Sequence, residues 1–221
     1  MKYTISEQIR YRSNYNRVSV YLQADLTHIT RPSDIFPDLP YTIRMMSDSD
    51  EDLRTWLDVL NDSYSIYNEK PIELSQSKTY LEQHPFLDVR AVYFLLDNTG
   101  CIGSITVGVY KENPSVGGVS RIAIRRSYMR KGLGKYITAY AYEQLLNDGV
   151  RYGQSIVMIK RESSLITHFK LGFHPQLNPK YKVYNNQKRF FFVRARAYWY
   201  VSGLYNRYRQ QFSEKFKENN A

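Results

Sequence analysis

Apolar residues in the first half of the chain recur at two spacings, which predict a strand followed by two helices. Residues 41–45 alternate apolar and polar side chains, as a half-buried strand does. Residues 47–51 supply the capping chemistry for a helix start, and 74–83 form a second helix that ends before Pro85. The first helix places four large apolar residues on one face: Leu53, Trp56, Leu57 and Leu60.

The second half of the chain begins with a predicted β-hairpin. Two β-rich runs, 89–96 and 101–110, flank the turn sequence Asp97-Asn98-Thr99-Gly100. Further strands are predicted at 118–124, 155–160, 181–184 and 189–201, and further helices at 133–147 and 163–171. Strands and helices in this order indicate an α+β fold.

The domain organisation follows from where this pattern begins and ends. Residues 1–40 contain Pro32, Pro37 and Pro40 and are interpreted as an N-terminal extension and connector, in which 18–22 is an added strand. The folded domain is expected at 41–201. A basic C-terminal tail follows at 202–221, of which 213–221 is polar enough to fray.

Composition narrows the class of protein. With 221 residues and 43% hydrophobic content, the chain can form one full core. No run approaches the roughly 18 apolar residues of a membrane helix, and the first residues lack a signal-peptide core, so a cytoplasmic protein without a membrane span is expected. Cys101 is the only cysteine and the four histidines are scattered, so no internal disulfide and no metal site are predicted.

The net charge of +10 is concentrated in two regions. Residues 120–135 carry six basic side chains and no acid, and 180–221 carry ten basic and two acidic ones. Such regions attract anions, of which phosphate groups are the commonest in cells. The second region is equally consistent with solvated surface.

A glycine turn lies inside the first basic region. Gly132-x-Gly134 stands between the strand 118–124 and the helix 133–147. Glycines let the backbone approach an anion closely, and the free amides of a helix first turn point toward it. The segment therefore predicts a phosphate-binding loop, to which Arg130, Lys131 and Lys135 add charge.

This loop resembles the central motif of the GNAT superfamily of N-acetyltransferases, Gln/Arg-x-x-Gly-x-Gly/Ala after a hydrophobic strand. The resemblance implies a mixed, mostly antiparallel sheet flanked by helices, and acetyl-coenzyme A as co-substrate. Loop residues would hold the coenzyme pyrophosphate: Arg130, Lys131, Gly132, Leu133, Gly134 and Lys135. Strand residues would lie along the pantetheine arm: Ile122, Ala123 and Ile124. Met129 departs from the family pattern, so one side-chain contact is missing.

A second match covers a later strand and helix. Residues 156–159 and 168–173, ending in Leu171-Gly172-Phe173, are similar to the corresponding family segment, so the likeness spans roughly 41–200. The sequence has neither the phosphate-loop motif of NTPases nor the third glycine of a dinucleotide fold.

The resemblance also suggests a catalytic acid. Many family members have a tyrosine four residues before the glycine of this ending, where His168 stands here. A histidine can donate a proton near neutral pH, so His168 is the candidate acid for the leaving thiolate. The alternatives are that His168 only packs or caps its helix, or that Tyr181 or Tyr184 is the acid. Ser163 or Ser164 could replace the family asparagine on this helix.

The other reactive groups are less clearly assigned. A backbone amide near Ile124 could polarise the thioester carbonyl. Residues 117–121 offer no glutamate as a general base, and Glu112 is the nearest acid in the sequence. Cys101 is interpreted as a core residue and not as a nucleophile.

The sequence thus predicts direct transfer of an acetyl group from acetyl-coenzyme A to a primary amine. The acceptor could be a small molecule, an amino sugar or a protein, and the basic C-terminal region favours an anionic or sugar-bearing one. The alternative is a non-catalytic protein of the same fold that binds nucleic acid or a protein partner through that region. A homodimer is left open.

Overall fold

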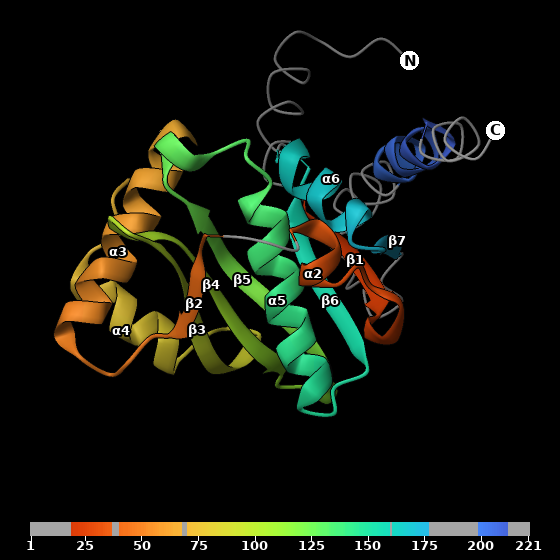
Figure 1. The fold of residues 1–221 in the computed structure, drawn as a ribbon. Helices are drawn as coiled ribbons and strands as arrows, with labels where there is room; N and C mark the ends of the chain where they lie inside the picture. Colours follow the sequence, from red (N-terminus) through yellow and green to blue (C-terminus); the bar gives the residue numbers. More distant parts are fainter. Residues whose placement is uncertain (1–18, 37–39, 68–69, 160, 177–198, 212–221) are drawn as a thin grey trace, which may run out of the picture. The chain divides into compact units, whose positions relative to one another are not determined.

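The computed structural model describes residues 19–36, 40–67, 70–159, 161–176 and 199–211 (Figure 1). The chain divides into two compact units. The larger unit is Ala24–Gln154, and the smaller one combines Met1–Gln23 with Ser155–Ala221.

Four antiparallel strands form the sheet of the larger unit, in the order β2 (Thr42–Met45), β3 (Leu87–Asp97), β4 (Gly100–Tyr110) and β5 (Asn113–Ile124). The start of β6 (Tyr152–Met158) pairs with β5 in parallel. Three residue pairs make up this ladder, from Val116↔Tyr152 to Gly118↔Gln154. The sheet is therefore mixed and mostly antiparallel, as predicted.

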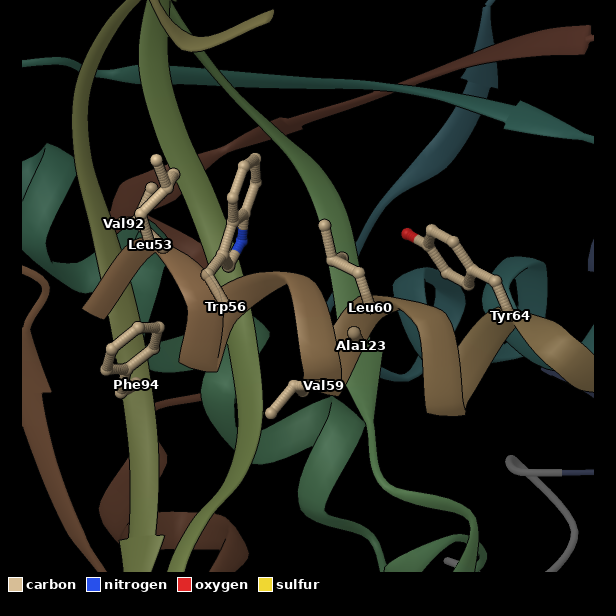
Figure 2. Close-up of a cluster of buried hydrophobic side chains, with 8 residues drawn as sticks. All are labelled: Leu53, Trp56, Val59, Leu60, Tyr64, Val92, Phe94 and Ala123. Carbon is tan, nitrogen blue, oxygen red and sulfur yellow. The ribbon is translucent and has the colours of Figure 1, made fainter. Parts of the chain in front are cut away.

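Helices cover both faces of this sheet (Figure 1). Val92 and Phe94 of β3 pack with α3 (Asp50–Tyr64), whereas Tyr93 between them contacts Tyr140 of α5 (Leu133–Asn147). Neighbouring strand residues point to opposite faces, so α3 and α5 lie on opposite sides. Figure 2 shows the core cluster under α3: Leu53, Trp56, Val59, Leu60, Tyr64, Val92, Phe94 and Ala123. The remaining elements of this unit are η1 (Leu26–His28), α2 (Pro32–Ile35), η2 (Ser65–Tyr67), α4 (Leu74–Glu82) and η3 (Arg126–Tyr128).

The start of α3 is fixed by its cap and by one ion pair. The hydroxyl of Ser49 accepts a hydrogen bond from the amide of Asp52 at 3.1 Å. The carboxylate of Asp52 accepts two bonds from Arg44 of β2, at 2.6 and 2.7 Å, and two more from the amide and hydroxyl of Ser47. These bonds hold the pKa of Asp52 well below its usual range, mainly through Arg44.

The smaller unit contains two more strands and two helical segments. Strand β1 (Ser19–Asp25) begins in this unit and pairs with β7 (His174–Gln176) in antiparallel fashion. Helix α6 (Glu162–Lys170) precedes β7, and residues 199–211 are also helical. The ring of Phe169 contacts both Tyr205 and Tyr208.

The α+β fold class is confirmed, and the added strand near residue 20 exists, but three predicted strands differ. The strand predicted at 118–124 begins earlier, at Asn113. The strand predicted at 155–160 lies at Tyr152–Met158, and β7 was not predicted. Residues 199–201 are helical and not the end of a strand. The aromatic composition of this region predicted β-structure. Tyr205 and Tyr208, however, both contact the ring of Phe169, and their three-residue spacing places them on one face of a helix. The rest of the predicted hairpin, 181–198, lies outside the described residues.

Among the described helices, none is long and apolar enough to cross a membrane.

Candidate functional site

The glycine loop connects the end of β5 to the start of α5. After Ile124 the chain forms η3, and Gly132 caps α5 with a left-handed backbone at φ 82° and ψ −6°. Arg130 is also left-handed, at φ 63°. Two left-handed residues in such a turn aim successive amides at the same side.

Five consecutive backbone amides of this loop, from Arg130 to Gly134, have no hydrogen-bond acceptor among the described residues. The next two amides are satisfied, because those of Lys135 and Tyr136 donate to the carbonyl of Gly132 at 3.0 and 3.1 Å. No side chain in the described part of the chain caps α5. The loop therefore presents free N–H groups at the positive end of a helix dipole, the arrangement that binds phosphate.

Gly134 tests whether this loop is built for a ligand. Among the described residues, a Cβ atom added to Gly134 would have only Ile124 Cγ1 within contact range, at 3.9 Å, and the φ of Gly134 is ordinary for any residue. Glycine inside a helix costs roughly 1 kcal/mol relative to alanine. Nothing in the described packing requires glycine here, so its absent side chain leaves room for an anion to approach the amides.

Gly132 is required by the protein itself. A Cβ atom at Gly132 would lie 2.9 Å from Cζ of Phe36, the residue after α2, in addition to its strained φ. Phe36 also packs edge-on against Tyr136 of α5 at a centroid distance of 6.0 Å. Arg31 pairs with Glu143 of α5 at 3.4 Å. Part of the predicted connector is thus packed against the loop.

Most basic side chains around the loop have structural partners. Arg125 pairs with Asp58 of α3 at 2.6 Å, and Arg126 pairs with Asp62 at 3.1 Å. The guanidinium of Arg121 lies over the ring of Tyr80 at 4.4 Å. The carboxylates of Asp58 and Asp62 offset the charges of Arg125 and Arg126, so these two arginines do not supply free charge to the loop.

Arg130 and Lys131 are exposed basic residues of the loop, and neither forms an ion pair with a described residue. The Lys131 ammonium lies 4.8 Å from the ring centroid of Tyr128. Tyr128 in turn donates to Asp97 at 2.5 Å. Lys135 is half-buried on the first turn of α5. Arg130 and Lys131 thus carry the positive charge that faces solvent beside the free amides.

The strand leading to the loop is irregular where it leaves β6. Within the described chain, the β5–β6 ladder ends at Gly118↔Gln154, so the edge of β5 from Val119 to Ile124 has no β6 partner. Arg121 adopts φ 49° and forms a bulge with Ile122 opposite Ile105. Ala123 and Ile124 are buried and Ile122 is half-buried. The backbone of this edge can pair with an extended ligand.

His168 lies in the smaller unit and is fully buried. Its Nδ1 donates to the carbonyl of Ser164 at 2.8 Å, and its ring packs edge-on against Phe173 at 5.3 Å. Burial lowers the pKa of His168 to about 4, so the imidazole is neutral at pH 7. With the proton on Nδ1, Nε2 has none to donate. This favours the packing alternative, and the catalytic role of His168 stays a prediction.

The buried imidazole should make folding sensitive to acid. The folded pKa of about 4 lies below the unfolded value near 6.5, so the unfolded chain binds more protons between these values. Stability is expected to fall as pH drops through this window, by up to about 3 kcal/mol from His168. Urea unfolding measured from pH 8 to 4 should show that the free energy of unfolding falls less steeply with pH in His168→Phe than in the wild type. An equal fall in both proteins would contradict a lowered pKa of His168.

Turnover of the same variant tests the catalytic role. If His168 is the proton donor, His168→Phe lowers turnover by at least about tenfold at constant cofactor affinity. Unchanged turnover would restrict His168 to packing.

The remaining candidate residues differ in their surroundings. Burial raises the pKa of Cys101 to about 11, so it is a neutral thiol and suits the core role. Glu112 is in the turn before β5, at the opposite end of that strand from the loop. Ser163 and Ser164 lie on α6. Tyr181 and Tyr184 fall outside the described residues. No group of three or more potential metal ligands is found in the described part of the chain.

Two features of the loop were missed by the sequence analysis. Phe36 stands in a Pro-rich stretch where no periodicity points to a contact with Gly132. Asp58 and Asp62 had a readable signal, since their four-residue spacing places both carboxylates on one face of the predicted helix.

Comparisons with solved structures support the same fold. A tandem GNAT protein from the clavulanic acid biosynthesis pathway matches with a TM-score of 0.55 and 14% identity, over 71% of this chain and 50% of that one. A GCN5-related N-acetyltransferase from Sphaerobacter thermophilus matches with a TM-score of 0.51 and 12% identity, over 80% and 55%. A phosphinothricin acetyltransferase from Sinorhizobium meliloti, in complex with AcCoA, matches with a TM-score of 0.50 and 19% identity, over 63% and 77%. This chain therefore spans about half the length of the first two structures.

At these identities the structural likeness shows the fold alone. A search of curated protein sequences gives no match. The model of the Acetyltransferase (GNAT) family matches residues 53–173, which is more than half of the chain and includes β5, the glycine loop and α5. The chain belongs to the acetyltransferase (GNAT) family.

Proposed function

We propose that this protein transfers an acetyl group from acetyl-coenzyme A directly to a primary amine. The observation that carries the proposal is the run of five amides from Arg130 to Gly134 that have no acceptor among the described residues, together with Gly134, which the described packing does not require to be glycine. The GNAT family uses acetyl-coenzyme A, and the match includes this loop. When bound, the coenzyme supplies the activated acyl group as a thioester.

Different groups of the loop and of β5 bind different parts of the coenzyme. The amides of Gly132, Leu133 and Gly134 hold the pyrophosphate, while the exposed charges of Arg130 and Lys131, with Lys135 on the first turn, attract it. Backbone groups of β5 beyond its ladder with β6 orient the pantetheine arm, at Ile122, Ala123 and Ile124; the carbonyl of Ile122 also accepts a hydrogen bond from Tyr64. These nine residues are the proposed cofactor site.

Proton transfer has no assigned side chain. Neither β4 nor β5 contains a carboxylate, so these two strands offer no Asp or Glu as a general base. A water molecule is the proposed acceptor of the amine proton, which suits an amine of low pKa. The anionic or sugar-bearing acceptor remains a proposal, because most of the basic region that favours it lies outside the described residues.

Thermal-shift titration followed by an acceptor screen tests the function. Acetyl-coenzyme A should raise the melting temperature, since a ligand that binds only the folded state stabilises it. Release of free thiol with one amine of a mixed panel would establish transfer. Binding without turnover on any amine would favour the non-catalytic alternative, and no binding would contradict the proposed cofactor site.

Phe36 should be a positioning residue of this site. Its ring contacts Gly132, so Phe36→Ala is expected to loosen the loop and raise the dissociation constant of coenzyme A about tenfold, with kcat changed little. Phe36→Tyr keeps the ring and should restore affinity. Phe86→Ala removes an aromatic ring that is 55% exposed and serves as the control. Equal affinity in Phe36→Ala would show that the loop holds its shape without this contact.

A further inference from the structure

Three fully buried polar atoms in the larger unit have no hydrogen-bond partner in the described part of the chain. They are the indole Nε1 of Trp56 and the hydroxyls of Ser104 and Thr106. Trp56 is 1% exposed, and both hydroxyl residues are 0% exposed. Buried polar groups in native proteins nearly always have a partner, so three together require one.

The strand register places the two hydroxyls side by side. Ser104 and Thr106 are two residues apart on β4, so their side chains leave the same face of the sheet. The partners across the two ladders are Phe94 and Ala123 for Ser104, and Val92 and Ser120 for Thr106. Val92, Phe94 and Ala123 belong to the cluster under α3, so both hydroxyls face that helix.

Trp56 covers the same place. It packs in one cluster with Val92, Phe94 and Ala123, the residues that flank the two hydroxyls (Figure 2). The indole of Trp56 therefore lies over the middle of β4. Trp56, Ser104 and Thr106 therefore all belong to the layer between α3 and the sheet.

Neighbouring polar side chains have partners of their own. The Tyr64 hydroxyl donates to the carbonyl of Ile122 at 3.3 Å. The Tyr80 hydroxyl donates to the Ser120 hydroxyl at 3.1 Å. An indole N–H can only donate, whereas a hydroxyl can donate and accept. The missing partner must therefore accept from Trp56 and exchange hydrogen bonds with two hydroxyls.

We propose that a buried water site lies between α3 and β4, held by Trp56, Ser104 and Thr106. A buried water typically makes about three hydrogen bonds, which is the number of unpartnered atoms here. Complete burial of all three atoms excludes a larger ligand that would reach them from solvent. The site adjoins the β5 bulge, because Ile105 between the hydroxyls is opposite Arg121 and Ile122. It does not depend on acetyl transfer.

The direction in which one substitution changes the melting temperature tests the proposal. Thr106→Val replaces the hydroxyl by a methyl group of similar shape. If water binds there, the variant loses a hydrogen bond and its melting temperature should fall by roughly 2–4 °C. If the hydroxyl is truly unpaired, Val removes a buried polar group and the melting temperature stays equal or rises. That result would overturn the proposal.

A double-mutant comparison with Trp56 tests whether the side chains bind one shared water or contribute to stability independently. In a Trp56→Phe background the water has already lost one partner, so Thr106→Val should cost clearly less there. Ser77→Ala is the control, because Ser77 is fully buried but bonds directly to the carbonyl of Leu74 at 2.6 Å. Its effect should be equal in both backgrounds.

A crystal structure decides the matter even if these variants fail to fold. Density for a water within about 3.2 Å of Trp56 Nε1 and both hydroxyls supports the proposal. Clear density for the three side chains with none between them would refute it.

Discussion

Gly134→Asp should abolish measurable binding of acetyl-coenzyme A and leave the protein folded. The new side chain would occupy the space beside the free amides of Arg130 to Gly134 and bring a negative charge to the proposed pyrophosphate site. A loss of at least about a hundredfold in affinity is expected, since steric exclusion and charge repulsion act together. Isothermal titration calorimetry of the wild type and the variant measures it.

The Gly134→Asp chain should still fold, because the substituted position is open. Within the part of the chain that the structure describes, the first added atom meets only Ile124 Cγ1, at 3.9 Å, and an acidic residue in the first turn of a helix is favourable. Gly134→Ala should even raise the melting temperature while it weakens binding. Gly203→Asp, at an open position of the helical segment 199–211, is the control and should bind normally. Full affinity in folded Gly134→Asp would refute the site.

Asp52→Asn should cause a large loss of stability for a single polar substitution. Asp52 is 6% exposed and accepts four hydrogen bonds, two of them from Arg44. An amide cannot accept all four, so a cost of about 3 kcal/mol is expected, and a melting temperature lower by roughly 6–12 °C. Thermal unfolding of the wild type and the variant, followed by circular dichroism, measures the difference.

The dependence on pH distinguishes charge from packing. The folded pKa of Asp52 is lowered, so its contribution is complete above the unfolded value near 3.9 and disappears as pH falls through the folded value. The difference between wild type and Asp52→Asn should therefore shrink only below about pH 4. Asp50→Asn is the control, because its pair with Lys78 is exposed and should contribute less than about 1 kcal/mol. Similar losses in both variants would contradict the role of Asp52.

The sequence predicted the local elements of the larger unit well because each had its own signal. The apolar spacing at Leu53, Trp56 and Leu60 predicted α3, and the turn 97–100 predicted the β3–β4 hairpin. The glycine turn marked the start of α5 at Leu133. These signals are short-range, so one sequence suffices to read them.

Contacts between distant segments left no such signal. The packing of Phe36 on Gly132 joins residues far apart in the sequence, and no local pattern encodes it. Arg125 and Arg126 belong to the basic region predicted at 120–135, but they pair with Asp58 and Asp62 of α3. The bulge at Arg121 likewise depends on pairing with β4. The number of basic side chains in the sequence is therefore larger than the number whose charge is available to a ligand.

One measurement tests the central claim most directly, a titration of the isotope-labelled protein with acetyl-coenzyme A followed by amide NMR. The five amides from Arg130 to Gly134 have no acceptor among the described residues, so they should show the largest downfield proton shifts when they bond to the pyrophosphate. Those of Lys135 and Tyr136, which already donate to Gly132, should move less. Binding that leaves the amides of Arg130 to Gly134 unshifted, with the main changes elsewhere, would contradict pyrophosphate binding at this loop.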